Sequence, residues 1–159
     1  MIHPIILGLF LLNITDPSLA WYEIAGRIFS VGLLNGTCAI NVSHELGHRK
    51  EWWNRLAADL LLLCSLENHF RPYHNYYHHK HVATTLDFTT AIKGEWCYTF
   101  WFREQIGSYL KAWEISKTNA LKKGQAPYSI HHYMLVATIA QISLFLLIYL
   151  IMGLSLIHI

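Results

Sequence analysis

The sequence predicts an all-α protein with polytopic membrane helices. Only 14% of the 159 residues are charged and 53% are hydrophobic, and the mean hydropathy is +0.27. Soluble domains carry about 25% charged residues, so this deficit excludes a disordered chain and disfavours an ordinary domain in water. Residues 133–153 contain no charged side chain, and about 20 such residues suffice to cross a bilayer. We therefore expect membrane helices with most charged residues between them.

The basic residues lie in the middle of the chain. The formal net charge is only +2, which gives no electrostatic argument for binding nucleic acid. Every lysine and arginine except Arg27 falls between Arg49 and Lys123. Because basic residues accumulate on the inner side of membranes, we expect this middle section to be cytoplasmic in an integral membrane protein.

The first elements are a short apolar segment and a longer helix. Residues 5–12 are too short to span, and neither a basic residue nor an A-x-A site flanks them as in a signal peptide. We interpret them as the end of a cut helix. After a turn at residues 15–18, residues 21–43 predict a helix long enough to span once and leading directly into His44.

The remaining elements alternate between membrane and surface. Residues 54–70 predict a helix that returns into the membrane or lies on it. Residues 71–130 are polar, aromatic and basic, with a weakly amphipathic helix over 102–115 and a loop at 124–127. Residues 133–153 then predict a transmembrane helix. The three cysteines lack CxxC spacing, so we interpret them as reduced side chains.

We interpret the last six residues as foreign to the protein. Residues 154–159, LSLIHI, can be back-translated into a sequencing-library adaptor. We therefore expect them to be a cloning or sequencing scar, and residues 1–153 to be a partial membrane domain truncated at both ends.

Two histidine clusters carry the chemistry. In the first, His44 and His48 are four residues apart, which places both imidazoles on one face of a helix. In the second, His74 and His78 repeat this spacing and His79 follows directly. One such pair is also common among ordinary surface or core histidines, but two pairs at the ends of apolar segments predict a metal site. Five imidazoles exceed what one tetrahedral zinc needs, so they favour a two-metal centre.

Three further residues are candidates for orienting the ligands. Glu45, His69 and His81 flank the two clusters and could each hold an imidazole by a hydrogen bond. Each is also compatible with an ordinary solvated side chain. Imidazole suits zinc, copper, iron and nickel, and iron is favoured if the chemistry is oxidative.

The clusters resemble the histidine boxes of a known family. HELGHRK at residues 44–50 is similar to the first box, HELGHK or HELGHR, of the integral-membrane non-haem di-iron alkane hydroxylases (alkane 1-monooxygenases), within the fatty-acid desaturase-like superfamily. HNYYHHKHVAT at residues 74–84 resembles the second box, EHNxGHH followed by VATPEDPA. Tyr73 and Tyr77 depart from this pattern, where the family has Glu and Gly. A later lone histidine motif and a third box, HxxHH, do not occur in this sequence.

The resemblance implies a membrane oxygenase. The implied reaction is terminal hydroxylation of alkanes with O2 as co-substrate and two non-haem iron ions as cofactor. The implied iron ligands are the five box histidines, His44, His48, His74, His78 and His79. The implied partners are an apolar alkane or acyl substrate, membrane lipid, and rubredoxin with its NADH-dependent reductase as electron donors. The implied location is the bacterial inner membrane with the site facing the cytoplasm, and without the third box we expect the fragment alone to be inactive.

Three alternatives stay open. A fatty-acyl desaturase or a xylene-type hydroxylase of the same superfamily uses similar boxes. A membrane zinc protease would use HELGH as H-E-x-x-H, with Glu45 as general base, but would leave the second cluster unexplained. A membrane protein that binds metal without chemistry is the third.

Overall fold

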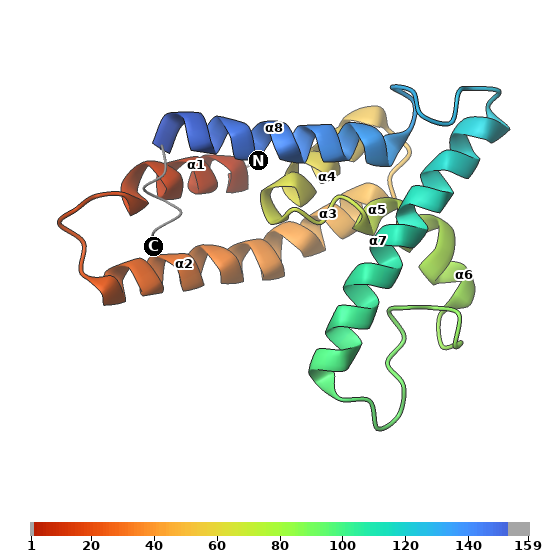
Figure 1. The fold of residues 1–159 in the computed structure, drawn as a ribbon, viewed down its shortest axis with the longest axis horizontal. Helices are drawn as coiled ribbons and strands as arrows, with labels where there is room; N and C mark the ends of the chain where they lie inside the picture. The colour runs from red at the N-terminus through yellow and green to blue at the C-terminus, as the bar shows by residue number, and fades with distance from the viewer. Residues whose placement is uncertain (1, 153–159) are drawn as a thin grey trace. The chain divides into compact units, whose positions relative to one another are not determined.

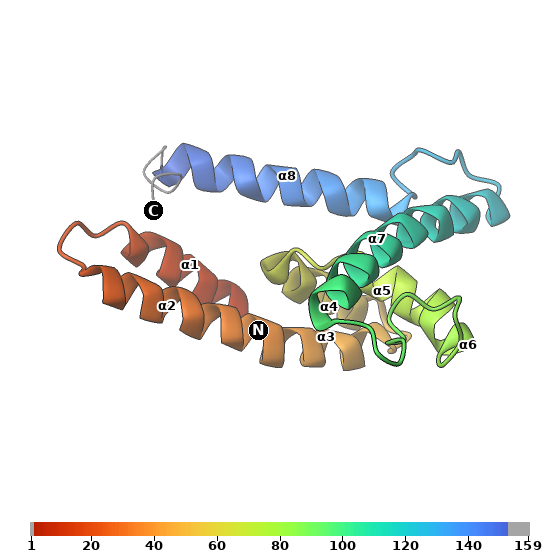
Figure 2. The same cartoon turned by 60° about the horizontal axis from the view of Figure 1, so that its bottom comes forward.

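Helices form the regular structure of residues 2–152, the part of the chain that the computed structural model describes, and this part contains no strand (Figures 1 and 2). The all-α prediction is therefore confirmed. The described chain divides into two units, residues 2–67 with 139–152 and residues 68–138. The expected scar at 154–159 lies outside the described residues.

The first unit begins with two helices joined by the turn predicted at residues 15–18. These are α1, His3–Ile14, and α2, Trp21–Leu34, which lie side by side in both views (Figures 1 and 2). Glu23 Oε2 accepts a hydrogen bond from the backbone N–H of Ala20 at 2.9 Å. This bond satisfies one of the amide groups that a helix start leaves without a partner.

The helix predicted over 21–43 extends further than expected and changes its winding. A π turn, η1 (Asn35–Ala39), separates α2 from α3 (Ile40–Gly47). A π turn contains one more residue than an α turn and is common at functional sites. The helical run therefore reaches through the first histidine cluster instead of ending before it.

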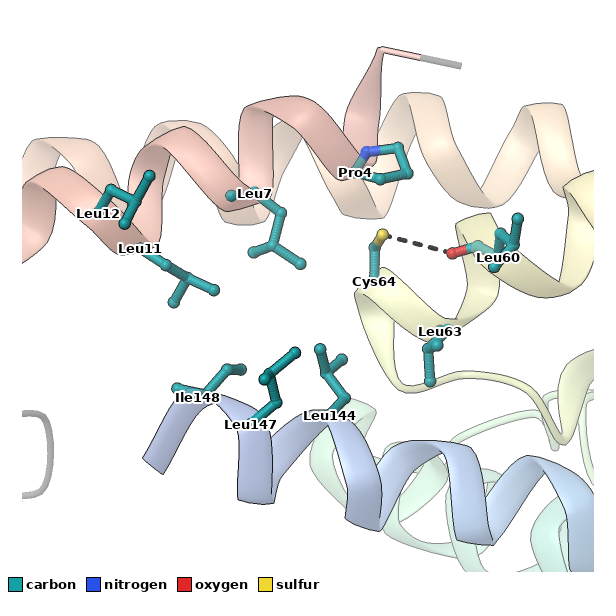
Figure 3. A pocket seen from close by; sticks show the side chains of 11 residues that line it. Pro4, Leu7, Leu11, Leu12, Leu60, Leu63, Cys64, Leu144, Leu147 and Ile148 are labelled. Carbon is teal, nitrogen blue, oxygen red and sulfur yellow. Dashed lines mark hydrogen bonds between the residues drawn. The ribbon is translucent and has the colours of Figure 1, made fainter. Parts of the chain in front are cut away.

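The next helix, α4 (Trp52–Ser65), packs against α3 and ends before the predicted boundary at residue 70. Leu66 follows it with a left-handed φ of +62°, which terminates the helix. Helices α1 and α4 and the part of α8 in the first unit enclose an apolar pocket of about 370 Å³ (Figure 3). Its walls are aliphatic and include Leu7, Leu11, Leu63, Cys64, Leu144 and Ile148.

The second unit carries the second histidine cluster on a short helical run. Its elements are α5 (Phe70–Tyr73), η2 (His74–His78, a π turn), α6 (His79–His81), α7 (Cys97–Lys122) and the start of α8 (Tyr133–Met152). α5 packs against α7, around a core centred on Tyr73, Ala112 and Met134. α7 is much longer than the helix predicted over 102–115, because small residues along it allow close packing.

One described helix has the length and composition to cross a membrane. It is the segment Tyr133–Leu150 of α8, with a mean hydropathy of 2.1 and mostly exposed side chains. The apolar helix predicted over residues 133–153 is therefore present as α8, up to Met152. The predicted second span over 21–43 is divided by the π turn, so several spans are not confirmed within residues 2–152.

Candidate metal centre

The first cluster places two imidazoles against each other at the end of α3, where His44 lies in the last turn and His48 follows as the C-cap. The Nε2 atoms of His44 and His48 are 3.1 Å apart and the ring centroids are 4.8 Å apart. The predicted stacking of this i, i+4 pair is therefore confirmed. At this separation the two nitrogen lone pairs can face one cation, which makes the pair chemically suited to metal binding.

Glu45 lies away from these rings. Its carboxylate forms an ion pair with the Arg49 guanidinium one turn along the helix, and its side chain is 63% exposed. Such exposed pairs contribute at most about 1 kcal/mol. The structure thus places Glu45 in a surface ion pair, and not on an imidazole as the sequence analysis considered.

The second cluster is arranged differently from the first because it lies on a π turn. The backbone N–H of His79 donates to the carbonyl of His74, five residues earlier. His74 therefore faces His79, with ring centroids 4.4 Å apart and ligating nitrogens within 4.8 Å. His74 and His78, the pair predicted by the i, i+4 spacing, also lie on one face, with their rings stacked 5.1 Å apart, while His78 Nδ1 turns toward a loop.

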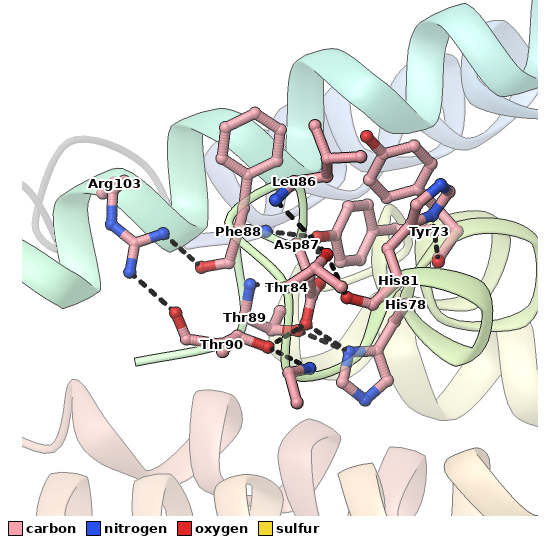
Figure 4. Close-up of polar contacts among 12 residues, drawn as sticks. Tyr73, His78, His81, Thr84, Leu86, Asp87, Phe88, Thr89, Thr90 and Arg103 are labelled. Carbon is pink, nitrogen blue, oxygen red and sulfur yellow. Dashed lines mark hydrogen bonds and ion pairs between the residues drawn. The ribbon is translucent and has the colours of Figure 1, made fainter. Parts of the chain in front are cut away.

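That loop supplies a buried carboxylate. His78 Nδ1 lies 2.9 Å from Oδ2 of Asp87, whose side chain is buried, and 2.7 Å from the Thr89 hydroxyl (Figure 4). Because a carboxylate only accepts hydrogen bonds, these partners assign the proton to Nδ1. The lone pair is then on Nε2, as in histidine ligands held by a carboxylate.

Asp87 stays ionised in this buried position. Burial alone would raise the pKa of Asp87, but hydrogen bonds from Thr90, Tyr73, Thr89 and His78 outweigh it and hold the pKa well below its usual range. Burial likewise raises the pKa of Tyr73, so its phenol is neutral and can donate. The sequence analysis did not name Asp87 as a site residue. Two signals mark it: its place at the Asp of the resembled VATPEDPA tail, and the following Phe-Thr-Thr, typical of a turn closed by side-chain hydrogen bonds.

The other two candidate orienting residues have their own environments. His81 Nδ1 lies 2.9 Å from the backbone carbonyl of Tyr77, and its ring packs on the Tyr77 ring. His69 is 6% exposed and packs edge-on against Tyr109. Burial lowers the pKa of His69 to about 4, so it is neutral at neutral pH.

We predict that His69 makes the metal-free protein acid-sensitive. Its pKa is about 4 in the folded chain and about 6.5 when unfolded, so only the unfolded chain gains a proton between these values. Stability is therefore retained above about pH 6.5 and falls as the pH drops toward 4, by up to about 1.4 kcal/mol per unit. Melting temperatures from pH 7 to 5 should fall less in His69→Gln than in wild type or in His131→Gln, an exposed control. Equal slopes in all three would contradict this.

The donor set of each unit fits a first-row transition metal. Every candidate ligand is an imidazole, which suits iron, zinc, copper and nickel, and His78 already has its Nε2 lone pair available. The three cysteines are free and stand apart from the histidine boxes in the sequence. The chemistry of these side chains is thus that of a histidine-ligated centre and not of a thiolate site.

Comparison with known proteins gives matches along most of the chain. Residues 19–158 match the family model for fatty acid desaturase. The chain is 36% identical to the alkane 1-monooxygenase of Ectopseudomonas oleovorans over 131 residues, which is 82% of this chain and 32% of that protein. It is 36% identical to alkane 1-monooxygenase 1 of Alcanivorax borkumensis over 124 residues, 78% of this chain and 30% of that protein.

A third relative carries out a different named reaction. The hydroxylase component of a xylene/toluene monooxygenase from Pseudomonas putida is 33% identical over 108 residues, 68% of this chain and 29% of that protein. The chain therefore spans about a third of the length of the curated relatives it matches.

Proposed function

The chain belongs to the fatty acid desaturase family, and from this premise we propose that the protein is a membrane oxygenase that hydroxylates the terminal carbon of alkanes. The similarity to alkane 1-monooxygenases over 82% of the chain supports the reaction class. The observation that carries the proposal is the pair of His78 and buried Asp87, because it fixes the tautomer that a metal ligand needs.

We propose that five histidines hold two non-haem iron ions. The proposed ligands are the histidines of the two boxes, His44, His48, His74, His78 and His79. When bound, iron supplies the activation of O2 by which one oxygen atom enters a C–H bond and the other, with two electrons and two protons, becomes water.

The residues of the chain have distinct tasks in this proposal. Asp87 keeps the proton of His78 on Nδ1, and the hydroxyls of Thr89 and Thr90 keep Asp87 charged. The apolar pocket between α1, α4 and α8 contains no charged side chain in its wall, so it suits a saturated hydrocarbon (Figure 3). α8 anchors the protein in the bilayer, into which alkanes partition.

The proposal extends to the electron donors and the orientation. We propose rubredoxin and an NADH-dependent rubredoxin reductase as donors, and a polytopic protein of the bacterial inner membrane. The basic residues between Arg49 and Lys123 support a cytoplasmic position for the histidine clusters.

Hydroxylation of a methyl group on an aromatic ring is the second candidate, supported by the xylene/toluene monooxygenase relative. The zinc protease alternative has less support, because Glu45, its general base, is engaged by Arg49. Desaturation of an acyl chain is a third outcome that the family assignment allows.

One isotope experiment separates these reactions. Membranes containing the full-length protein are supplied with NADH, reductase, rubredoxin and ¹⁸O2, and with a medium-chain alkane, p-xylene or an acyl substrate in parallel. We expect a 1-alkanol carrying one ¹⁸O atom. Labelled methylbenzyl alcohol from xylene alone would favour the second candidate, and an alkene without label would indicate desaturation. No NADH-dependent product from any substrate would contradict the proposal.

A further inference from the structure

Tyr73 is the most deeply buried aromatic residue of the second unit, and its hydroxyl lies at the centre of a polar network. The side chain is 1% exposed and belongs to α5, directly before the π turn. Its hydroxyl donates to Asp87 Oδ1 at 2.6 Å and accepts the backbone N–H of Phe88 at 2.8 Å (Figure 4). The phenol therefore connects the histidine helix to the loop that carries Asp87.

Both oxygens of Asp87 are engaged. Oδ1 receives the Tyr73 hydroxyl, Oδ2 faces His78 Nδ1 and receives the Thr90 hydroxyl, and the Thr89 hydroxyl lies 2.9 Å from Oδ1 and 3.1 Å from Oδ2. With both oxygens engaged, the carboxylate plane cannot rotate without breaking a buried hydrogen bond. Such a break leaves a buried polar group without a partner, which is costly.

We propose that Tyr73 is a positioning residue for His78. Its hydroxyl holds the carboxylate of Asp87 in the orientation in which Oδ2 accepts the Nδ1 proton, and so fixes the orientation of the His78 ring with its lone pair on Nε2. This inference rests on the proposed iron centre. Tyr73 stands at the position where the resembled second box has Glu, so the contact between the Tyr73 hydroxyl and Asp87 depends on a residue in which this chain departs from that box.

The backbone of the loop has separate support, so the hydroxyl can be removed without releasing the loop. The Arg103 guanidinium on α7 donates to the carbonyls of Phe88 and Thr90, each at 3.0 Å. It also forms a two-bond ion pair with Glu95, both contacts at 2.7 Å. Loss of the phenol oxygen should therefore change the orientation of Asp87 more than the path of the chain.

Tyr73→Phe tests this role, because it removes one oxygen atom and keeps the ring. The matched control is Tyr77→Phe, since Tyr77 lies one turn further along and contacts its neighbours through its ring. The full-length protein is purified in detergent and loaded with iron. Iron per chain, the rate of iron loss to a chelator, and the melting temperature with and without iron are then measured.

We expect Tyr73→Phe to lose iron about tenfold faster than wild type, as when other partners of metal-bound histidines are removed. Tyr77→Phe should match wild type. Asp87→Asn should act in the same direction, and Tyr73→Phe in the Asp87→Asn background should add little, because both act through one carboxylate. This comparison of single and double variants can still be interpreted if Tyr73→Phe lowers the melting temperature of the metal-free protein.

The possible results bear differently on the positioning role of Tyr73 and on the proposed function. Wild-type rates of iron loss in Tyr73→Phe, or additive effects of Tyr73→Phe and Asp87→Asn, would overturn the positioning role. A wild-type protein that binds no iron would instead overturn the proposed function. The inference is supported if iron loss is faster in Tyr73→Phe than in Tyr77→Phe, and if Tyr73→Phe causes no further increase in the Asp87→Asn background.

Discussion

Replacing His78 or His48 by alanine is expected to lower the iron content of the purified protein by more than about tenfold and to abolish hydroxylation. In His78→Ala the centre loses the imidazole whose tautomer Asp87 fixes. In His48→Ala the Nε2 atom facing His44 at 3.1 Å is gone. Neither side chain lies in the apolar face of α8, so the amount of protein in the membrane fraction should not change.

The control for these variants is His131→Ala, since His131 is exposed and lies in the loop before α8. Iron per chain is measured by elemental analysis, and insertion by the share of protein that resists carbonate extraction. His131→Ala should equal wild type in both. Full iron content in either His48→Ala or His78→Ala would remove that residue from the ligand set.

Gly107→Ala is expected to destabilise the second unit although alanine is the better helix former. A Cβ at this position of α7 would lie 2.3 Å from Cδ1 and 2.4 Å from Cγ of Phe88. The ring must therefore be displaced, while the Phe88 backbone that carries it is held by Tyr73 and Arg103. Such overpacking costs roughly 1–3 kcal/mol, which exceeds the gain of about 1 kcal/mol in helix propensity.

The displaced loop carries Asp87, so Gly107→Ala should also accelerate iron loss. Gly26→Ala in α2 is the matched control, because its Cβ would meet no atom within 4 Å. Removing the ring provides the second test. In the double variant Gly107→Ala/Phe88→Ala, part of the melting temperature lost in Gly107→Ala should be restored, so that the effects of the two substitutions are less than additive. A melting temperature in Gly107→Ala at or above wild type would contradict the predicted clash.

The first cluster could be predicted from the sequence because local structure decides it. His44 lies on the α-helix α3 and His48 caps its end with helical backbone angles, so the i, i+4 spacing alone determines that the rings meet. The long apolar run of α8 was predictable for the same reason, since length and composition suffice.

The second cluster was predicted less well because its geometry depends on a π turn and on distant residues. No residue pattern marks the extra residue in η2, which brings the His79 ring within 4.4 Å of His74 while the His78 ring stacks on His74 at 5.1 Å. Asp87 reaches His78 only because the loop folds back onto α5 and α7, a tertiary effect. The length of α7 was underestimated similarly, since packing, and not amphipathic periodicity, stabilises it.

Metal analysis of the purified full-length wild-type protein tests the central claim most directly. The protein is produced in medium containing iron, zinc, copper and nickel, and each metal is measured per chain. The proposed histidine-ligated centre predicts about two iron ions per chain and little of the other metals. A preparation that is folded and membrane-inserted but holds one zinc ion, or no metal, would contradict it.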